Sequence, residues 1–283
     1  MKSIALKTNN SQTIDYLQNE LLNFNMDNVY FTSKQFKHYN NFIIHYKGNN
    51  EAVFINKVAS LLSFLVIYEF EEDFLKNSIY KNYFYFSSHE REIILSNCYD
   101  IMVDSKDYLK NKYNILFSIF KSYLINNNKI FLNGFINFRL QQYHDLLDSV
   151  VNEAVNSFII EKEYQEFISM LKLYINSQNC NSSEIHVVYS NDFTLILDEN
   201  KNIIENSNKM LNAKFLSDIT FSTNDYTLNT LLNELPEKLY IHLINNTIDE
   251  FIRTLTLIFD KRVVICNDCN ICNLYKKNIL SKK

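Results

Sequence analysis

The chain has 283 residues, of which 47% are hydrophobic, and such a chain can bury one large core or two smaller ones. Its formal net charge of -4 and its scarcity of arginine provide no field that would concentrate a polyanion, which argues against a general nucleic-acid binder. Its two glycines, Gly48 and Gly134, leave no glycine-rich loop that could cradle a phosphate.

The N-terminal segment predicts a small α/β element. Residues 3–7 have the pattern of a short strand, and Ile14, Leu17 and Leu21 recur at helical spacing after residues 10–12. A second strand is predicted over residues 42–46, where a β-rich run meets a turn signal.

Residues 51–126 are predicted to be helical, with breaks near residues 87–90 and 104–107. Residues 58–68 carry no charge and are mostly apolar, but a membrane-spanning helix needs roughly 20 such residues. We therefore expect a buried helix and no membrane span. The N-terminus has no apolar run of signal-peptide length, and the odd number of cysteines suits a reducing compartment, so the expected location is cytoplasmic.

A long helical region is predicted over residues 129–177, as a helical hairpin or a bent rod with a break near residues 161–163. An Asn/Ser-rich linker over residues 178–183 follows, and the hydrophobic period then changes to that of strands. After the linker we predict a hairpin of residues 184–189 and 193–197, with a further strand at 203–204. Helices and strands then alternate, with a helix at 227–235, a strand at 238–244, a helix at 247–259 and a strand at 262–266.

The predicted fold class is therefore α+β, with a mostly helical N-terminal and central region that carries the small N-terminal α/β element. We predict three regions. They are an N-terminal α+β and helical region at 1–128, the long helical hairpin or rod at 129–181, and a C-terminal α/β domain with a cysteine-rich tail at 182–283.

The strongest chemical signal is a C-x2-C-x2-C segment formed by Cys266, Cys269 and Cys272. Three thiolates at this spacing are three of the four ligands of a structural zinc site, and they also match the first three ligands of an iron–sulfur run. Redox chemistry, attachment of a partner, and a tail that binds no metal stay open as alternatives, because C-x2-C pairs also occur without a metal.

A fourth ligand is predicted from the expected strand order. A helix joins the strands at 238–244 and 262–266, so a βαβ crossover should place these strands side by side, with His242 near the end from which the cysteines emerge. His242 is thus the best candidate and His186 on the preceding hairpin is the second. Either could instead be a hydrogen-bonded histidine on a half-buried sheet face.

Several segments of the second half resemble the YtxC-like family of sporulation proteins found in endospore-forming, low-GC bacteria. They are residues 135–143, residues 158–167, residues 184–188, and residues 259–272 with the cysteine triplet. The resemblance implies a cytoplasmic protein of sporulating cells, and it implies no particular reaction.

We expect from these observations a non-enzymatic interaction or regulatory module with a protein partner of unknown identity, no catalytic residues, and a C-terminal cysteine site. The alternative is a redox, iron–sulfur or zinc protein in which Cys266, Cys269 and Cys272 are catalytic or sensing groups.

Overall fold

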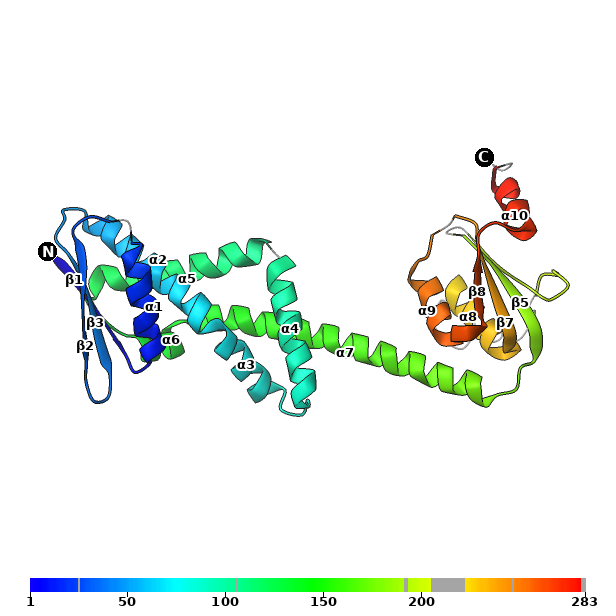
Figure 1. Cartoon of the computed structure of the whole chain (residues 1–283), viewed down its shortest axis with the longest axis horizontal. Coiled ribbons are helices and arrows are strands. Elements are labelled where there is room, and N and C mark those ends of the chain that lie inside the picture. Colours follow the sequence, from blue (N-terminus) through cyan, green and yellow to red (C-terminus); the bar gives the residue numbers. More distant parts are fainter. Residues whose placement is uncertain (25, 105, 191–192, 205–221, 246, 281–283) are drawn as a thin grey trace, which may run out of the picture. The chain divides into compact units, whose positions relative to one another are not determined.

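The computed structural model describes residues 1–24, 26–104, 106–190, 193–204, 222–245 and 247–280. The chain divides into two compact units, Met1–Glu161 and Lys162–Lys283 (Figure 1). One helix, α7 (Gln141–Ser177), supplies residues to both. The α+β fold class is confirmed, with a mostly helical first part and a C-terminal α/β part.

The first unit contains one mixed sheet and a set of helices. Its strands pair in the order β2-β3-β1-β4; β1 is antiparallel to β3 and parallel to β4. The elements are β1 (Lys2–Thr8), α1 (Ser11–Leu22), β2 (Val29–Gln35), β3 (Asn40–Tyr46), α2 (Glu51–Glu69), α3 (Glu71–Asn82), α4 (Ser88–Asp104), α5 (Lys106–Asn126), β4 (Lys129–Phe131), α6 (Leu132–Arg139) and the first part of α7. The strands predicted at 3–7 and 42–46 are β1 and β3, whereas β2 and β4 were not predicted.

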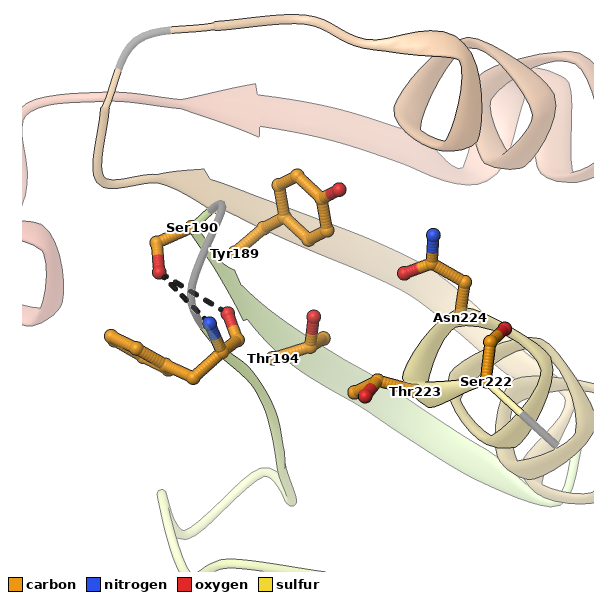
Figure 2. A pocket seen from close by; sticks show the side chains of 7 residues that line it. Tyr189, Ser190, Thr194, Ser222, Thr223 and Asn224 are labelled. Carbon is orange, nitrogen blue, oxygen red and sulfur yellow. Dashed lines mark hydrogen bonds between the residues drawn. The ribbon is translucent and has the colours of Figure 1, made fainter. Parts of the chain in front are cut away.

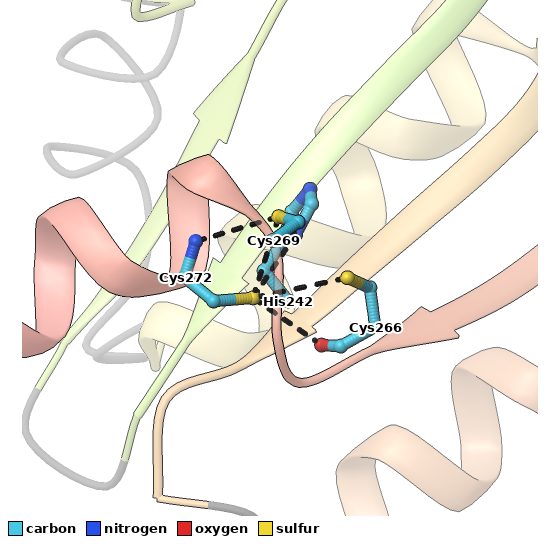
Figure 3. Close-up of side chains that lie close together, drawn as sticks. All are labelled: His242, Cys266, Cys269 and Cys272. Carbon is cyan, nitrogen blue, oxygen red and sulfur yellow. Dashed lines mark hydrogen bonds between the residues drawn. The ribbon is translucent and has the colours of Figure 1, made fainter.

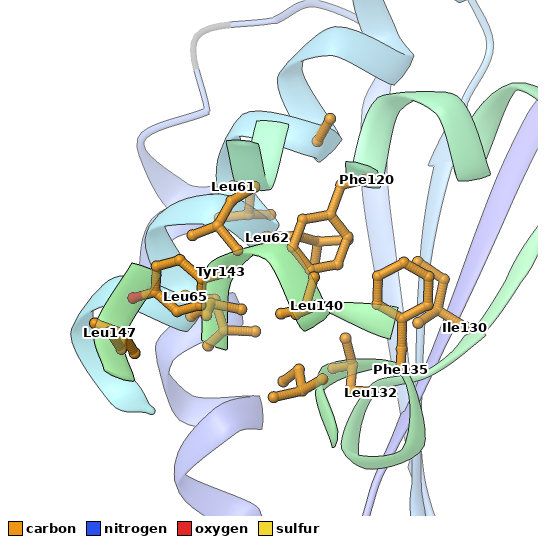
Figure 4. Packing of buried hydrophobic residues seen from close by; sticks show 14 of the residues in the cluster. Leu61, Leu62, Leu65, Phe120, Ile130, Leu132, Phe135, Leu140, Tyr143 and Leu147 are labelled. Atoms are coloured by element: carbon orange, nitrogen blue, oxygen red, sulfur yellow. The ribbon is translucent and has the colours of Figure 1, made fainter. Parts of the chain in front are cut away.

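Helix α2 lies at the centre of the first core. Its buried side chains include Val58, Leu62 and Leu65, and Figure 4 shows Leu62 and Leu65 packed near Phe120 and Tyr143. By length and composition alone α2 could cross a membrane, yet half of its most apolar window is buried inside the protein. Because a core helix of a soluble protein has these same properties, the described chain shows no clear membrane span.

The same core encloses an ion pair. Lys112 Nζ lies 2.8 and 3.0 Å from the two carboxylate oxygens of Glu71, and the Tyr143 hydroxyl donates to the same carboxylate. All three side chains are buried. Two buried charges are tolerated when they pair with each other and their remaining hydrogen-bonding capacity is filled. Here Tyr143 fills part of that capacity by donating to the Glu71 carboxylate.

The second unit is a layered α/β domain. Its strands pair in the order β6-β5-β7-β8; β6 is antiparallel to β5, and the β5–β7 and β7–β8 pairs are parallel. Its elements are the last part of α7, β5 (Ser182–Tyr189), β6 (Thr194–Leu197), α8 (Thr223–Glu234), β7 (Pro236–Leu243), α9 (Glu250–Phe259), a 3-10 turn at Asp260–Arg262, β8 (Val263–Cys266) and α10 (Asn270–Leu280). The predicted adjacency of the strands at 238–244 and 262–266 is confirmed by the β7–β8 pair.

The two faces of this sheet differ in what covers them. Odd-numbered residues of β5 and β7, such as Val187 and Ile241, share a core with α8, α9 and the end of α7. Even-numbered residues point to the opposite face, because successive side chains of a strand alternate. There Val188 and Ile244 pack with Cys272 of the C-terminal tail. The polar side chains His186 and His242 are even-numbered, so they lie on this second face.

The predicted helical region differs from the structure in its breaks. Helix α7 runs unbroken through residues 161–163, and the interruption occurs at Leu140, between α6 and α7. Residues 129–131 form β4 because they pair with β1, although a helix was predicted to begin there.

Candidate metal centre

Four potential ligands come from three neighbouring elements of the second unit. His242 is near the end of β7, Cys266 is the last residue of β8, Cys269 precedes α10 and Cys272 is in the first turn of that helix. Strand pairing places His242 directly opposite Cys266. Because register partners in a parallel sheet point to the same face, this pairing brings the imidazole to the thiols.

The tail returns to the sheet through a short turn. The backbone N–H of Cys272 donates to Cys269 Sγ at 3.5 Å, and Lys276 Nζ donates to the Asn267 carbonyl at 2.7 Å. The start of a helix at Asn270 puts Cys269 and Cys272, three positions apart, on one side of the turn. A C-x2-C turn of this kind is the usual way to place two zinc ligands.

The four ligand atoms, one from each residue, all lie within 4.8 Å of one another (Figure 3). His242 Nδ1 is 3.3 Å from Cys269 Sγ and 3.4 Å from Cys272 Sγ. Cys272 Sγ is 3.6 Å from Cys269 Sγ and 3.9 Å from Cys266 Sγ. Among the residues that the structure describes, these four form the one group of at least three His, Cys, Asp or Glu side chains close enough for a single ion.

These distances can be compared with the edges of a zinc tetrahedron. A Zn–S bond of about 2.3 Å and a Zn–N bond of about 2.0–2.1 Å place two sulfurs about 3.8 Å apart and a sulfur and a nitrogen about 3.5 Å apart. The separations of 3.3–3.9 Å correspond to those edges. The arrangement is therefore compatible with one tetrahedral ion bound by three thiolates and one imidazole.

The surroundings keep His242 neutral. Burial, followed by the nearby His186 and Lys201, lowers the pKa of His242 to about 4. A neutral imidazole has a lone pair on one nitrogen, and that nitrogen is Nδ1 when the other nitrogen carries the proton. His242 can consequently act as a ligand at neutral pH without losing a proton.

The thiols differ in how readily they ionise. Burial raises the pKa of Cys272 to about 12. Burial also opposes ionisation of Cys269, but hydrogen bonds from the Cys272 backbone and from the Cys266 and Cys272 side chains outweigh it and lower the pKa of this thiol. Metal binding requires thiolates, so a bound cation would have to promote the loss of the Cys272 proton.

Apolar side chains cover the cluster. Val188, Leu197 and Ile244 are buried with Cys272, and Phe193 and Tyr275 pack against them. His242 and Cys272 are thus shielded from water, whereas Cys266 and Cys269 are half-buried.

His186 is not one of the four. Its Nδ1 lies 2.9 Å from His242 Nε2, the nitrogen that points away from the thiols. His186 was predicted as the second candidate for a fourth ligand, and the structure places it behind the imidazole that reaches the cysteines. Its even-numbered position on β5 was the signal that could have indicated this arrangement.

A polar hollow of about 240 Å³ lies elsewhere in this unit, beside the end of β5 (Figure 2). Its lining includes Tyr189, Thr194, Ser222 and Asn224. The Tyr189 hydroxyl donates to Asp249, and the Ser222 hydroxyl caps α8. The residues that line it include no carboxylate, imidazole, thiol or amine, so the described lining offers no acid/base pair for catalysis.

Comparison with known proteins gives one family and one curated relative. The sequence model of the YtxC-like family matches residues 56–264. The chain is 22% identical over 201 residues to "Uncharacterized protein YtxC" of Bacillus subtilis (strain 168), which corresponds to 68% of this chain and 70% of that protein. No solved structure matches. The family match includes His242 and ends before Cys266, so it provides no information about the three thiols.

Proposed function

Because the chain belongs to the YtxC-like family, we propose that it is a cytoplasmic, non-enzymatic interaction or regulatory protein of sporulating cells. We further propose that a zinc ion bound by His242, Cys266, Cys269 and Cys272 fixes its C-terminal tail to the sheet. The sporulation setting rests on the resemblance to the YtxC-like sporulation proteins. The zinc site rests on the geometry of this chain.

One observation carries the zinc proposal, namely that four ligand atoms of the kinds zinc prefers lie within 4.8 Å of one another. A four-iron cluster fits less well. In such a cluster each ligand binds a different iron, so the ligands are spread around the cluster and do not surround one point.

The completeness of the ligand set supports a structural role. Catalytic zinc sites have three protein ligands and an open position for water or substrate, whereas structural sites have four protein ligands. Here His242 completes the set with the three thiols, and Cys272 and His242 are buried. A zinc ion held in this way would have no position left for a substrate.

A dithiol switch is the second candidate. Cys269 and Cys272 have their sulfurs 3.6 Å apart, and Cys269, the more easily ionised of the two, is only half-buried. Oxidation would join these sulfurs in a disulfide, with two protons and two electrons passing to a cellular oxidant such as a protein disulfide. Zinc and the disulfide are mutually exclusive, since zinc binds thiolates and the sulfurs of a disulfide are no longer thiolates.

Metal analysis of protein purified without oxygen and without chelators tests the zinc site. We expect one zinc per chain and no visible absorbance. Cys266→Ser, Cys269→Ser or Cys272→Ser should each abolish stoichiometric zinc, because the two remaining thiolates and one imidazole would bind the ion too weakly. Cys98→Ser and Cys180→Ser are the matched controls and should leave the zinc content unchanged, since both cysteines are outside the group.

Two results would contradict this proposal. A visible absorption band with stoichiometric iron and sulfide would assign a cluster, and a wild-type chain that takes up neither zinc nor iron would exclude a metal. In the second case, loss of accessible thiols upon mild oxidation of wild type but not of Cys269→Ser would favour the dithiol switch.

Genetics tests the biological setting. Deletion of the gene should leave vegetative growth near normal and lower the yield or quality of spores. Complementation with Cys180→Ser should restore sporulation, and complementation with Cys272→Ser should not. A strain whose defect is confined to exponential growth would refute the assignment to sporulation.

A further inference from the structure

We infer that His186 positions His242 for the metal, as the first member of a hydrogen-bonded chain that continues to Glu184. This inference rests on the proposed zinc site. It assigns a role to a histidine that binds no ion itself, and it links the site to the β5–β6 hairpin.

The strands bring the two histidines together from positions 56 residues apart. β5 and β7 are parallel neighbours, with His186 opposite Tyr240 and Val188 opposite His242. The His186 ring stacks on Tyr240, with ring centroids 4.8 Å apart and 12° between the ring planes. The His186 and His242 rings lie nearly in one plane, with centroids 5.2 Å apart and 20° between the planes, and they meet edge to edge through their hydrogen bond. His186 is 5% exposed and His242 is 3% exposed. His186 is thus held by burial, by stacking on Tyr240 and by its hydrogen bond to His242, as a residue that orients a ligand requires.

The direction of each hydrogen bond follows from the ion. A metal on His242 Nδ1 uses the lone pair of that nitrogen, so the proton must be on Nε2. The Nε2–H then donates across 2.9 Å to His186 Nδ1. His186 must accept on Nδ1, and its own proton is therefore on Nε2.

The far edge of His186 meets a carboxylate and an ammonium group. His186 Nε2 is 3.5 Å from Glu184 Oε1, and Lys201 Nζ lies 3.2 Å from the same carboxylate oxygen and also against His186 Nε2. The carboxylate can accept the Nε2 proton, whereas the ammonium group would need a lone pair on that nitrogen. Only the bond to Glu184 is consistent with a metal on His242, so Lys201 pairs with Glu184 when zinc is bound.

Two variants separate the hydrogen bond from the packing. His186→Phe retains a stackable ring and removes the acceptor, which leaves the His242 Nε2–H buried without a partner. His186→Asn removes the ring but places its Oδ1 where Nδ1 was. His45→Phe is the matched control, since His45 is also a strand histidine stacked on a tyrosine, Tyr30, with hydroxyl groups at both ring nitrogens.

The measurement is the zinc dissociation constant of the full chain, obtained by competition with a chromophoric chelator. Loss of a partner that orients a ligand typically weakens metal binding about 10–100-fold. We expect a loss in that range for His186→Phe, recovery of most of the affinity for His186→Asn, and no change for His45→Phe. Nitrogen-15 NMR of zinc-loaded wild type should find the proton on Nε2 in both His186 and His242.

Several results would overturn the proposed role of His186. Wild-type zinc affinity in His186→Phe, or a proton on His186 Nδ1 in the zinc-loaded chain, would overturn the role of His186 and leave the zinc site standing. Equal losses in His186→Phe and His186→Asn would assign the effect to packing and would also overturn it. A wild-type chain that takes up no zinc would refute the zinc site and this inference together.

Discussion

The two units are stabilised in different ways. The first has an extensive apolar core around α2, with the buried ion pair of Glu71 and Lys112 inside it. The second covers one face of its sheet with helices, whereas the other face carries two histidines and a tail of three thiols. The tail has little apolar surface to bury, since Cys272 is the only buried residue in the range 267–276, over which burial is described. A local cross-link through a metal would replace the missing core.

The largest expected effect is therefore that of metal removal on the second unit. The binding free energy of structural zinc is about 10–16 kcal/mol in zinc-finger peptides at neutral pH. A chelator should lower the unfolding transition of the second unit and increase hydrogen exchange in β8 and α10, with little change in the first unit. Calorimetry with exchange mass spectrometry measures both. Equal shifts of the unfolding transition in both units would contradict a stabilising role of the metal in the second unit alone.

The next largest effect concerns the ion pair of the first unit. Glu71→Gln should lower the free energy of unfolding by about 3–5 kcal/mol, because it leaves Lys112 buried without a counter-charge. Glu72→Gln is the matched control. Glu72 pairs with Lys76 at the surface of the same helix, where water screens an ion pair and its contribution to stability is small. Zinc content should be unchanged in both variants, and a loss of zinc in Glu71→Gln would show that the units are not independent.

A smaller effect is expected at helix caps in the two units. Asp249 caps α9 by accepting from the Ile252 N–H at 3.0 Å, and Asn10 caps α1 by accepting from the Gln12 N–H at 2.9 Å. Asp249→Ala and Asn10→Ala should each lower the free energy of unfolding by about 0.5–2 kcal/mol. Asp249→Ala should have the larger cost because Asp249 also accepts from Tyr189. Chemical denaturation of the two variants compares them, and a larger cost for Asn10→Ala would contradict this ranking.

The smallest effect on stability is expected from a cut in the linker. The boundary predicted after residue 181 stays a prediction, and limited proteolysis tests it. Residues 178–181 are exposed and connect α7 to β5, so we expect the first cleavage there. First cleavage within α7 near residues 160–163, also exposed on much of their surface, would place the boundary inside the helix instead.

Much of the second unit could be predicted from local sequence. The strands and helices from β5 to β8 follow from changes of hydrophobic period, and the position of His242 beside the thiols followed from a crossover rule. The helix α10 could not be predicted from hydrophobic period, because residues 267–273 are mostly polar. Its start at Asn270 depends on the tail's return to the sheet.

Other features could not be predicted because they arise from pairing between distant residues. β2 has one face of polar side chains and is mostly exposed, so its sequence lacks the signal of a buried strand, and β4 has three residues that become a strand only beside β1.

The sequence by itself determined the fold class, the C-x2-C-x2-C spacing and the best candidate for a fourth ligand, since these depend on composition, spacing and chain order. Only the tertiary structure decided that His186 lies behind His242 and that the four potential ligand atoms lie within 4.8 Å of one another. The physical reason is that strand register fixes which side chains meet, and register is set by contacts between segments far apart in the chain.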